Sequence, residues 1–470
     1  MRTLLAIGLS ILSFTWSEAQ YISRVLEYVP APGQFTNTEP WGSPVAASTL
    51  KGGVNGSMCL GAFGGYVIFR FEEPVENDPG NPYGVDFTLF GNPMEHWSEP
   101  GVVWVMKDEN ENGLPDDTWF ELAGSDFHFS STLRDYEVTY INPGDSVARE
   151  VSWSDQLGGT GIIEINSVHT QPYYPRPDSF PAISPEKYTL TGTLIEGALD
   201  VDHPPVLKSA RRAFGYADNQ MRGQTSLNLP DNPYTLEVEN SGGDAFDIRW
   251  AVDSSGSYVD LDQIHFVKVQ NAMLADGKYL GELSTEITGG VDVAPDPSVE
   301  GNLDLLVIKD LPAEIESLEY QLEVFAFYQG RVIPNPDVKW SSSNPGVTVD
   351  KQHVLRASEP GPVTLTAYLT DKTQVNATVS SNIVAAATDA YETGLELGAP
   401  NIFPNPASEF VQIRGIKKVA LGIYTAEGRT ALYLEEYRGG TLDISSLPSG
   451  IYMVRIDNGV SMKYLRLLII

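Results

Sequence analysis

The sequence predicts an all-β protein built from several β-sandwich domains in tandem, and three observations support this. The chain has 470 residues, more than one domain usually holds. It contains 43 Gly and 32 Pro, which are typical of many turns between short strands. No segment keeps a helical period of apolar residues beyond roughly three turns.

The negative charge of the chain argues against nucleic acid as a partner and suits the binding of cations. The formal net charge is −32, so a nucleic-acid partner is not expected and anionic lipid is disfavoured. Abundant carboxylates keep an extracellular protein soluble, and they also suit the binding of cations such as calcium. The single cysteine, Cys59, cannot form an intramolecular disulfide and is expected to be buried.

Residues 1–19 are expected to be a signal peptide. A short basic start precedes an apolar run from Leu4 to Trp16, which is too short to span a bilayer well. Small residues near the end of the segment predict cleavage after Ala19. No later segment is apolar enough to be a transmembrane segment, so we expect the mature protein to leave the cytoplasm.

Residues 401–470 show short alternating runs separated by Gly and Pro, which predicts a small antiparallel sandwich. Residues 403–408 read FPNPAS, residues 419–429 read VALGIYTAEGR, and residues 442–456 read LDISSLPSGIYMVRI. These motifs resemble the type A C-terminal sorting domain of the type IX secretion system of Bacteroidetes. The resemblance implies recognition by the outer-membrane translocon and a secreted, cell-surface location.

Residues 304–387 are expected to form an Ig-like sandwich. The segments VKWSSSNPGVTV at 338–349 and PGPVTLTA at 360–367 resemble the bacterial Ig-like (group 2) domain, in which Trp340 would be a core residue. The resemblance implies a spacer or an adhesive unit. Residues 388–400 are small and acidic, and we expect them to link this domain to the sorting domain.

Residues 20–297 are expected to carry whatever is specific to this protein. Glycine-rich and alternating segments predict strands of a sandwich at 60–71, 83–92, 99–106, 119–122, 245–253 and 259–269. These segments resemble galactose-binding, discoidin-like domains, which implies a jelly-roll sandwich. The stretch from 125 to 234 matches less well, and we expect it to be an insertion.

The segment 108–117, DENENGLPDD, is the strongest candidate metal site. Its oxygen-bearing residues follow the spacing of a calcium loop, with Gly113 at the sharp turn in position 6. Trp119 stands at position 12, where such loops carry an acid, so Asp117 or Glu121 would have to replace it. The expected ligands are oxygens of Asp108, Asn110, Asn112, Leu114, Asp116 and Asp117.

A structural calcium ion (Ca²⁺) in this loop is the favoured interpretation. The alternative is a solvated acidic hairpin with Asn-Gly turn chemistry. A second and weaker candidate for calcium is a group of acids that flank the last sandwich strands. Its members are Asp244, Asp247, Glu282 and Glu286.

Aromatic residues in loop-like segments form the candidate ligand surface. Exposed rings beside polar side chains stack against sugar faces and other flat rings. The alternative is that these rings cover the edges of a large core. The candidate ligand-binding residues are Trp97, Tyr173, Tyr174, Arg212, Phe214, Tyr216 and Asp218.

The sequence favours a non-catalytic, calcium-stabilised binding protein at the cell surface, with an extracellular glycan as the leading ligand. One alternative is capture of a small nutrient such as a corrinoid, since proteins of similar layout resemble companions of TonB-dependent receptors. Another is a structural or adhesive role. A carbohydrate-active hydrolase or lyase on a jelly-roll scaffold is the enzymatic alternative, although the chain has no Gly-x-Ser-x-Gly elbow and no His-Glu-x-x-His motif.

Overall fold

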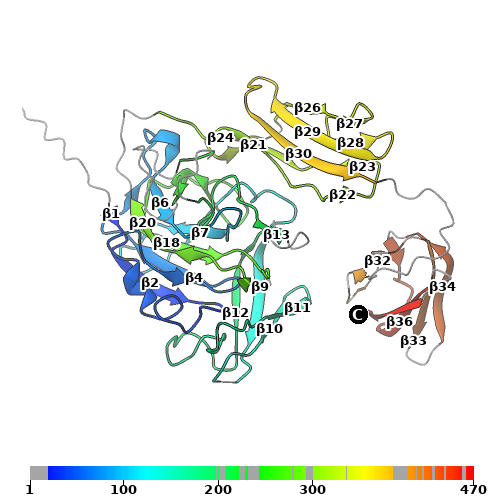
Figure 1. The fold of residues 1–470 in the computed structure, drawn as a ribbon, viewed down its shortest axis with the longest axis horizontal. Coiled ribbons are helices and arrows are strands. Elements are labelled where there is room, and N and C mark those ends of the chain that lie inside the picture. Colours follow the sequence, from blue (N-terminus) through cyan, green and yellow to red (C-terminus); the bar gives the residue numbers. More distant parts are fainter. Residues whose placement is uncertain are drawn as a thin grey trace, which may run out of the picture. The chain divides into compact units, whose positions relative to one another are not determined.

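The computed structural model of the chain confirms the all-β class (Figure 1). The chain divides into two compact units, Met1–Ala385 and Ala386–Ile470. The predicted signal peptide and the predicted linker at 388–400 lie outside the described residues. The structure describes residues 20–470 except 145, 197–198, 201–207, 222–227, 231–242, 278–279, 293–299, 335, 385–400, 404, 406, 409, 415, 417, 426–428, 439–440, 458–461 and 470.

Helices are short in the part of the chain that the structure describes. They are α1 (Ala46–Thr49) and the 3₁₀ turns η1 (Pro82–Gly84) and η2 (Ile248–Trp250). No helix among these residues is long and apolar enough to cross a membrane.

The N-terminal region is a sandwich of two antiparallel sheets. The smaller sheet has the order β1-β20-β6-β15, with bounds Gln20–Tyr21, Gly289–Asp292, Phe87–Phe90 and Gly243–Phe246. The larger sheet has the order β16-β8-β7-β18-β4-β2, with bounds Ala251–Val252, Trp119–Leu122, Gly101–Met106, Phe266–Asn271, Tyr66–Arg70 and Arg24–Val29. Figure 1 shows β7, β18 and β4 side by side in this sheet.

The alternation of side chains divides the larger sheet into two faces. On β18, Val267 and Val269 belong to the main core, which also contains Phe87 and Phe246 of the smaller sheet. Lys268 and the other even-numbered side chains of β18 point the opposite way. The sandwich therefore has a closed apolar interior and a second, more polar face on the larger sheet.

Residues 133–194 form another sheet, in the stretch where we expected an insertion. Its order is β11-β10-β9-β12, with bounds Thr160–Ile163, Val151–Asp155, Leu133–Ile141 and Lys187–Leu194. Its core packs on the glycine-rich turn after β3, where the Tyr140 hydroxyl donates to the Phe63 carbonyl at 2.8 Å. Gly64 has a φ of +84°, and a Cβ there would lie 2.6 Å from the Cβ of Leu190, so this contact requires glycine.

Three short strand pairs complete the region. They are β3 with β19 (Met58–Cys59 and Glu286–Ile287), β5 with β17 (Val75–Glu76 and Gln263–Ile264), and β13 with β14 (Leu199–Asp200 and Lys208–Ser209).

The Ig-like module follows within the same unit and has three sheets. Trp340 is half-buried against two apolar clusters, as expected of a core residue, and its indole N–H donates to His353 Nδ1 at 3.1 Å. The first sheet is β21-β24-β25 (Leu305–Ile308, Val324–Tyr328, Arg331–Val332). The second is β22-β30-β29-β26 (Glu314–Ile315, Asn376–Ile383, Gly361–Leu369, Val338–Ser342). The third is β23-β28-β27 (Glu319–Gln321, Val354–Ala357, Val347–Val349).

The first sheet of the Ig-like module packs directly against the N-terminal sandwich. Phe327 on β24 belongs to the main core, and its ring centroid lies 5.1 Å from that of Phe214. The Trp250 indole N–H donates to the Gln329 carbonyl at 3.2 Å. The two parts of the first unit therefore share one core.

The second unit is a two-sheet sandwich with its own apolar core. One sheet is β31-β32-β35 (Asn401–Phe403, Phe410–Arg414, Thr441–Asp443). The other is β34-β33-β36-β37 (Thr430–Tyr437, Val419–Thr425, Gly450–Asp457, Met462–Ile469). Alternate residues of these strands, such as Leu421 and Val454, fill the space between the sheets.

Truncation at the shared core should destabilise the whole first unit. Phe327→Ala removes a ring that is 1% exposed, and we expect a loss of about 3–5 kcal/mol in the free energy of unfolding. Urea denaturation of the mature protein measures this. Tyr328→Ala is the matched control, because the side chain of Tyr328 is 51% exposed on the same strand. Equal effects of the two substitutions would contradict the shared core.

Candidate functional site

The loop between β7 and β8 contains the predicted calcium ligands, and hydrogen bonds link several of them. The Asp108 carboxylate accepts hydrogen bonds from the backbone N–H groups of Asn112, at 3.1 Å, and Gly113, at 2.7 Å. The side-chain oxygen of Asn112 accepts one from the N–H of Leu114 at 2.7 Å. Gly113 has a φ of +72°, which is the turn that the spacing predicts there.

The second half of the loop folds back onto the first. The Asn112 amide nitrogen lies 3.1 Å from both carboxylate oxygens of Asp116. Asp117 accepts from the Asn110 amide at 3.2 Å and from the N–H of Glu109 at 2.9 Å. Asp108, Asp116 and Asp117 are thus linked through the backbone and amide N–H groups of the loop, although among the described residues their carboxylates do not lie within 4.8 Å of one another as a group. Carboxylate oxygens are the hard donors that calcium prefers.

Glu121, one of the two acids considered as a replacement for position 12, does not join this loop. Its Oε2 accepts a hydrogen bond at 2.6 Å from the hydroxyl of Thr193 on β12. Of the two acids considered, Asp117 is the one whose carboxylate forms hydrogen bonds within the loop. At the other end, the N–H of Asp108 donates to His265 Nδ1 at 3.1 Å, which ties the loop to the strand before β18.

A groove of about 400 Å³ lies on the polar face of the larger sheet. Pro115 and Trp119 line it from the candidate calcium loop and from the start of β8, so this loop forms one wall. The other side chains that give the groove its chemical character are Glu27, Tyr66, Tyr188, Lys268 and Gln270.

One row of side chains crosses this face in register. Lys268 pairs with Trp104 on one side and with Ile68 on the other, and directly opposed residues of antiparallel strands point to the same face. The row continues to Glu121 beyond Trp104 and to Glu27 beyond Ile68. The sheet therefore presents acids at both ends of the row and a cation near its centre.

The Lys268 ammonium lies between two aromatic rings. Its Nζ is 5.2 Å from the centroid of Tyr66 and 5.1 Å from that of Trp104. Burial lowers the pKa of Lys268 to about 8, whereas the negative charges of Glu121 and Glu27 act in the opposite direction. Burial raises the pKa of Glu121 to about 7.

Two polar atoms near this row have no hydrogen-bond partner among the described residues. They are the indole nitrogen of Trp104 and the amide oxygen of Gln270, which lines the groove. A buried polar atom without a partner costs free energy.

The predicted aromatic ligand surface is buried instead of exposed. Tyr173 and Tyr174 fill the core of the inserted sheet, and Phe214 packs edge-on against Trp250 in the main core. Trp97 and Tyr216 share a further apolar cluster. The expectation that these rings are exposed is wrong, because the insertion and the Ig-like module cover the edges where they lie.

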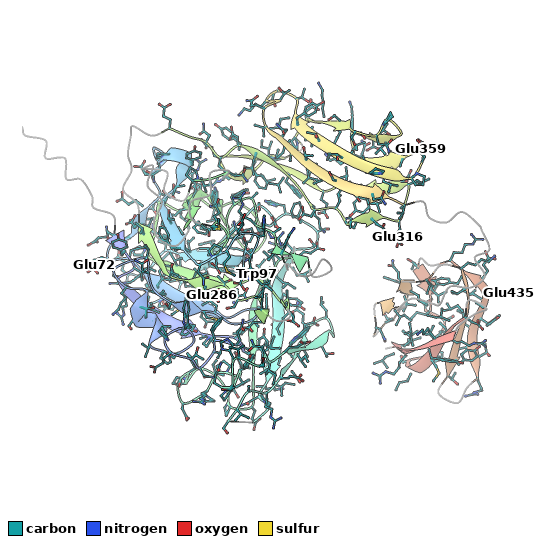
Figure 2. All side chains as sticks on the ribbon, in the orientation of Figure 1. Glu72, Trp97, Glu286, Glu316, Glu359 and Glu435 are labelled. Carbon is teal, nitrogen blue, oxygen red and sulfur yellow. The ribbon has the colours of Figure 1, made fainter. Side chains whose placement is uncertain are left out.

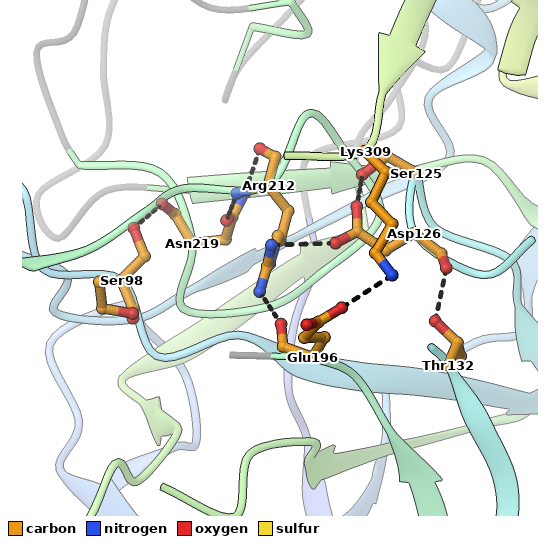
Figure 3. Close-up of polar contacts among 9 residues, drawn as sticks. Ser98, Ser125, Asp126, Thr132, Glu196, Arg212, Asn219 and Lys309 are labelled. Carbon is orange, nitrogen blue, oxygen red and sulfur yellow. Dashed lines mark hydrogen bonds and ion pairs between the residues drawn. The ribbon is translucent and has the colours of Figure 1, made fainter. Parts of the chain in front are cut away.

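Arg212 also has its charge satisfied inside the protein. Its guanidinium forms an ion pair with Asp126 at 3.1 Å and donates to the Glu196 carbonyl (Figure 3). Lys309 of the Ig-like module reaches the Glu196 carboxylate at 3.0 Å. A direct contact of Arg212 and the buried rings with a ligand stays an untested prediction.

Asp218, the last of the predicted ligand residues, belongs to a buried carboxylate cluster. One oxygen each of Glu99, Asp218 and Glu286 lie within 4.8 Å of one another. Figure 2 shows Glu286 beside Trp97 in the interior of the N-terminal region, and Glu99 interacts with both residues. A Cβ on Gly91 would lie 2.1 Å from Asp218 Oδ1, so a side chain there would displace the carboxylate.

Backbone donors hold this cluster in place. Asp218 accepts from the N–H groups of Asn92 and Glu286, both at 2.8 Å, and Glu99 accepts from the N–H of Ser284 at 3.0 Å. Burial raises the pKa of Glu99 to about 7, and burial and then the charge of Glu99 raise the pKa values of Asp218 and Glu286. Three buried acids so close together require shared protons or a bound cation.

The second acidic group from the sequence is divided by the structure. Glu286 joins the cluster, and Asp244 accepts from the N–H of Asn219 at 2.9 Å. Asp247 instead lies near Asp86, whose pKa is raised by burial and then by the charge of Asp247. Glu282 accepts from the N–H of Gln34 at 2.9 Å.

Sequence reasoning missed the groove residues Tyr66, Lys268 and Gln270. The available signal was the alternation within 266–271, which places Lys268 and Gln270 opposite the apolar Val267 and Val269. The partners that make this face a groove come from distant parts of the chain and carry no local signal.

Comparison with known proteins identifies the C-terminal unit. The family model of the secretion system C-terminal sorting domain matches residues 401–470. A search of curated proteins found no significant match.

Solved structures align only loosely with the chain. A chimeric titin Z1Z2 is 16% identical, with 36% of this chain and 97% of that chain covered and a TM-score of 0.15. Domains 1–6 of the surface layer protein SbsC are 9% identical, with 86% and 52% covered and a TM-score of 0.18. Latent PorU from Porphyromonas gingivalis is 12% identical, with 71% and 29% covered and a TM-score of 0.15. At these TM-scores none of the three assigns a function to the chain.

The sorting domain determines where the protein works. The chain is a secreted, cell-surface protein that interacts with the type IX secretion system through residues 401–470. The predicted location is confirmed.

The buried carboxylates should make stability depend on pH. The folded-state pKa values of Glu99 and Asp244, both about 7, lie above the ordinary values of these groups. Their contribution is therefore fully present at low pH and is lost as pH rises through about 7. In EDTA the melting temperature should fall between about pH 5 and pH 8, and Glu99→Gln should flatten this fall.

Differential scanning calorimetry measures the pH dependence. Glu95→Gln is the control, because Glu95 is exposed and should leave the slope unchanged. A melting temperature that rises over the same range would contradict the assignment of raised pKa values.

Proposed function

We propose that this protein is a non-catalytic binding protein of the cell surface, whose N-terminal sandwich binds an extracellular glycan in the groove of the larger sheet. The observation that carries the proposal is the groove of about 400 Å³ itself. Tyr66, Trp119 and Tyr188 offer ring faces for the apolar faces of sugars, while Lys268 and Gln270 offer polar groups for hydroxyls.

Calcium has a structural role in this proposal. An ion bound by loop 108–117 would fix the positions of Pro115 and Trp119, which line the groove. The convergence of Asp108, Asp116 and Asp117 on the loop amides supports it. An ion that binds the loop in the folded protein, and not in the unfolded chain, would stabilise the fold by mass action.

The same proposal includes the families to which the two parts of the first unit belong. Two facing antiparallel sheets support a jelly-roll, galactose-binding-like N-terminal sandwich. The packing of Trp340 between two apolar clusters supports a group 2 Ig-like module at 304–387. In this arrangement the Ig-like module supports the sandwich, since the two parts share a core.

Calcium should raise the melting temperature of the mature protein by several degrees relative to EDTA. Asp108→Ala should abolish this rise, because the Asp108 carboxylate binds the backbone N–H groups of Asn112 and Gly113 at the turn. Differential scanning fluorimetry measures it. Glu109→Ala is the matched control from the same loop and should keep the rise. If Asp108→Ala responds to calcium like the unmodified protein, the loop is not the calcium site.

A glycan that binds the mature protein in calcium buffer should depend on the groove rings. We expect Trp119→Ala to weaken binding about tenfold, which corresponds to about 1.4 kcal/mol. A glycan array followed by isothermal titration calorimetry measures this. Tyr21→Ala, an exposed aromatic at the edge strand β1, should have no effect. Binding that is indifferent to Trp119 would place the ligand outside the groove.

A further inference from the structure

We infer that the groove selects glycans that carry an acidic substituent, and that Lys268 is the residue that recognises the anionic group. This inference rests on the proposed function, because it names the ligand class of the same groove. The inference follows from the position of Lys268, from the aromatic rings around it, and from the fact that the nearby acids are hydrogen-bonded to other side chains.

Lys268 is the only basic residue among the described residues that line the groove. It lies on β18, between β7 and β4 in the middle of the six-stranded sheet. A central strand leaves little freedom to the backbone, so the base of the side chain is fixed. A ligand that enters the groove therefore meets this single cation at a defined place.

The two flanking rings hold the ammonium. Its distances of 5.2 Å to the Tyr66 centroid and 5.1 Å to the Trp104 centroid fall within the range of cation–π contacts. Such contacts restrict a side chain that is otherwise flexible and strongly hydrated. Lys268 is thus preorganised, and a ligand loses less free energy in ordering it.

The nearby acids do not pair closely with this cation. In the described parts of the chain, no carboxylate lies within 4.0 Å of Lys268 Nζ, and each neighbouring acid has another partner. Glu27 Oε1 accepts from the Tyr66 hydroxyl at 3.0 Å, and Glu121 Oε2 accepts from the Thr193 hydroxyl at 2.6 Å. A partly buried cation without a close counter-ion is costly, and a ligand carboxylate or sulfate would supply one.

Selection by Lys268 is local, since the protein as a whole carries a net charge of −32. That charge slows the approach of polyanions, especially at low ionic strength. It disfavours long, densely charged chains and leaves glycans with few acidic groups as the best fit. The charged and titratable groups around Lys268 are Glu27 on β2, Tyr66 on β4, Glu121 on β8 and Tyr188 on β12.

These groups predict a pH dependence with a definite sign. The pKa of Lys268 is about 8, so its positive charge is lost as pH rises beyond that value. Glu121, with a pKa of about 7, gains negative charge over a similar range. The tyrosines Tyr66 and Tyr188 have raised pKa values and stay neutral. Affinity for an acidic glycan should therefore fall between about pH 6 and pH 9, whereas affinity for a neutral glycan should not.

The test uses pairs of oligosaccharides that differ only in charge. Tetragalacturonate and tetramannuronate are each compared with their methyl esters, by calorimetry on the mature protein in excess calcium. We expect the acid of at least one pair to bind about tenfold more tightly than its ester. Lys268→Met should remove this preference by lowering the affinity for the acid far more than that for the ester, and Lys268→Arg should retain the preference.

The outcomes separate the two proposals. If the acid and its ester bind equally, or if Lys268→Met keeps the preference, the inference on Lys268 is overturned and glycan binding stands. If none of the four oligosaccharides binds, neither the acids nor their esters, the result counts against the glycan groove and against the inference together. Melting temperatures of the Lys268→Met and Lys268→Arg variants within a few degrees of the unmodified protein confirm that both fold.

Discussion

The period-two alternation of the six-stranded sheet is the constraint on which the rest of the first unit depends. On β4 and β18, Val67, Phe69, Val267 and Val269 enter the main core, and their neighbours along the chain face the groove. A shift of one residue in register would exchange the two faces, placing Lys268 in the core and valines in the groove. The apolar contacts that stabilise the fold therefore also fix the position of the groove residues on this sheet.

Several acids of this negatively charged chain lie in the interior. In the cluster of Glu99, Asp218 and Glu286, backbone N–H groups of residues 92, 284 and 286 donate to Asp218 and Glu99. Such an arrangement makes the geometry of these segments depend on protonation or on a cation. The loop at 108–117 is different, because its carboxylates range from the buried Asp108 to the exposed Asp116 and are linked by local hydrogen bonds. The buried cluster therefore affects the stability of the fold, and the loop at 108–117 affects the wall of the groove.

Local patterns were predictable from the sequence, and contacts between distant segments were not. The motifs of residues 401–470 identified the sorting domain, and the spacing within 108–117 predicted the sharp turn at Gly113. The all-β class followed from turn residues and alternation. The groove combines residues as far apart as Tyr66 and Lys268, and no local pattern reports that they meet. The burial of Tyr173 and Phe214 was mispredicted for the same reason, since distant segments cover them.

A crystal structure of the mature protein with a bound oligosaccharide and calcium would test the central claim most directly. The groove account predicts a sugar ring stacked on Trp119, Tyr188 or Tyr66, with its polar groups near Lys268 and Gln270. A sugar bound on the Ig-like module, or a groove left empty beside a ligand elsewhere, would contradict it.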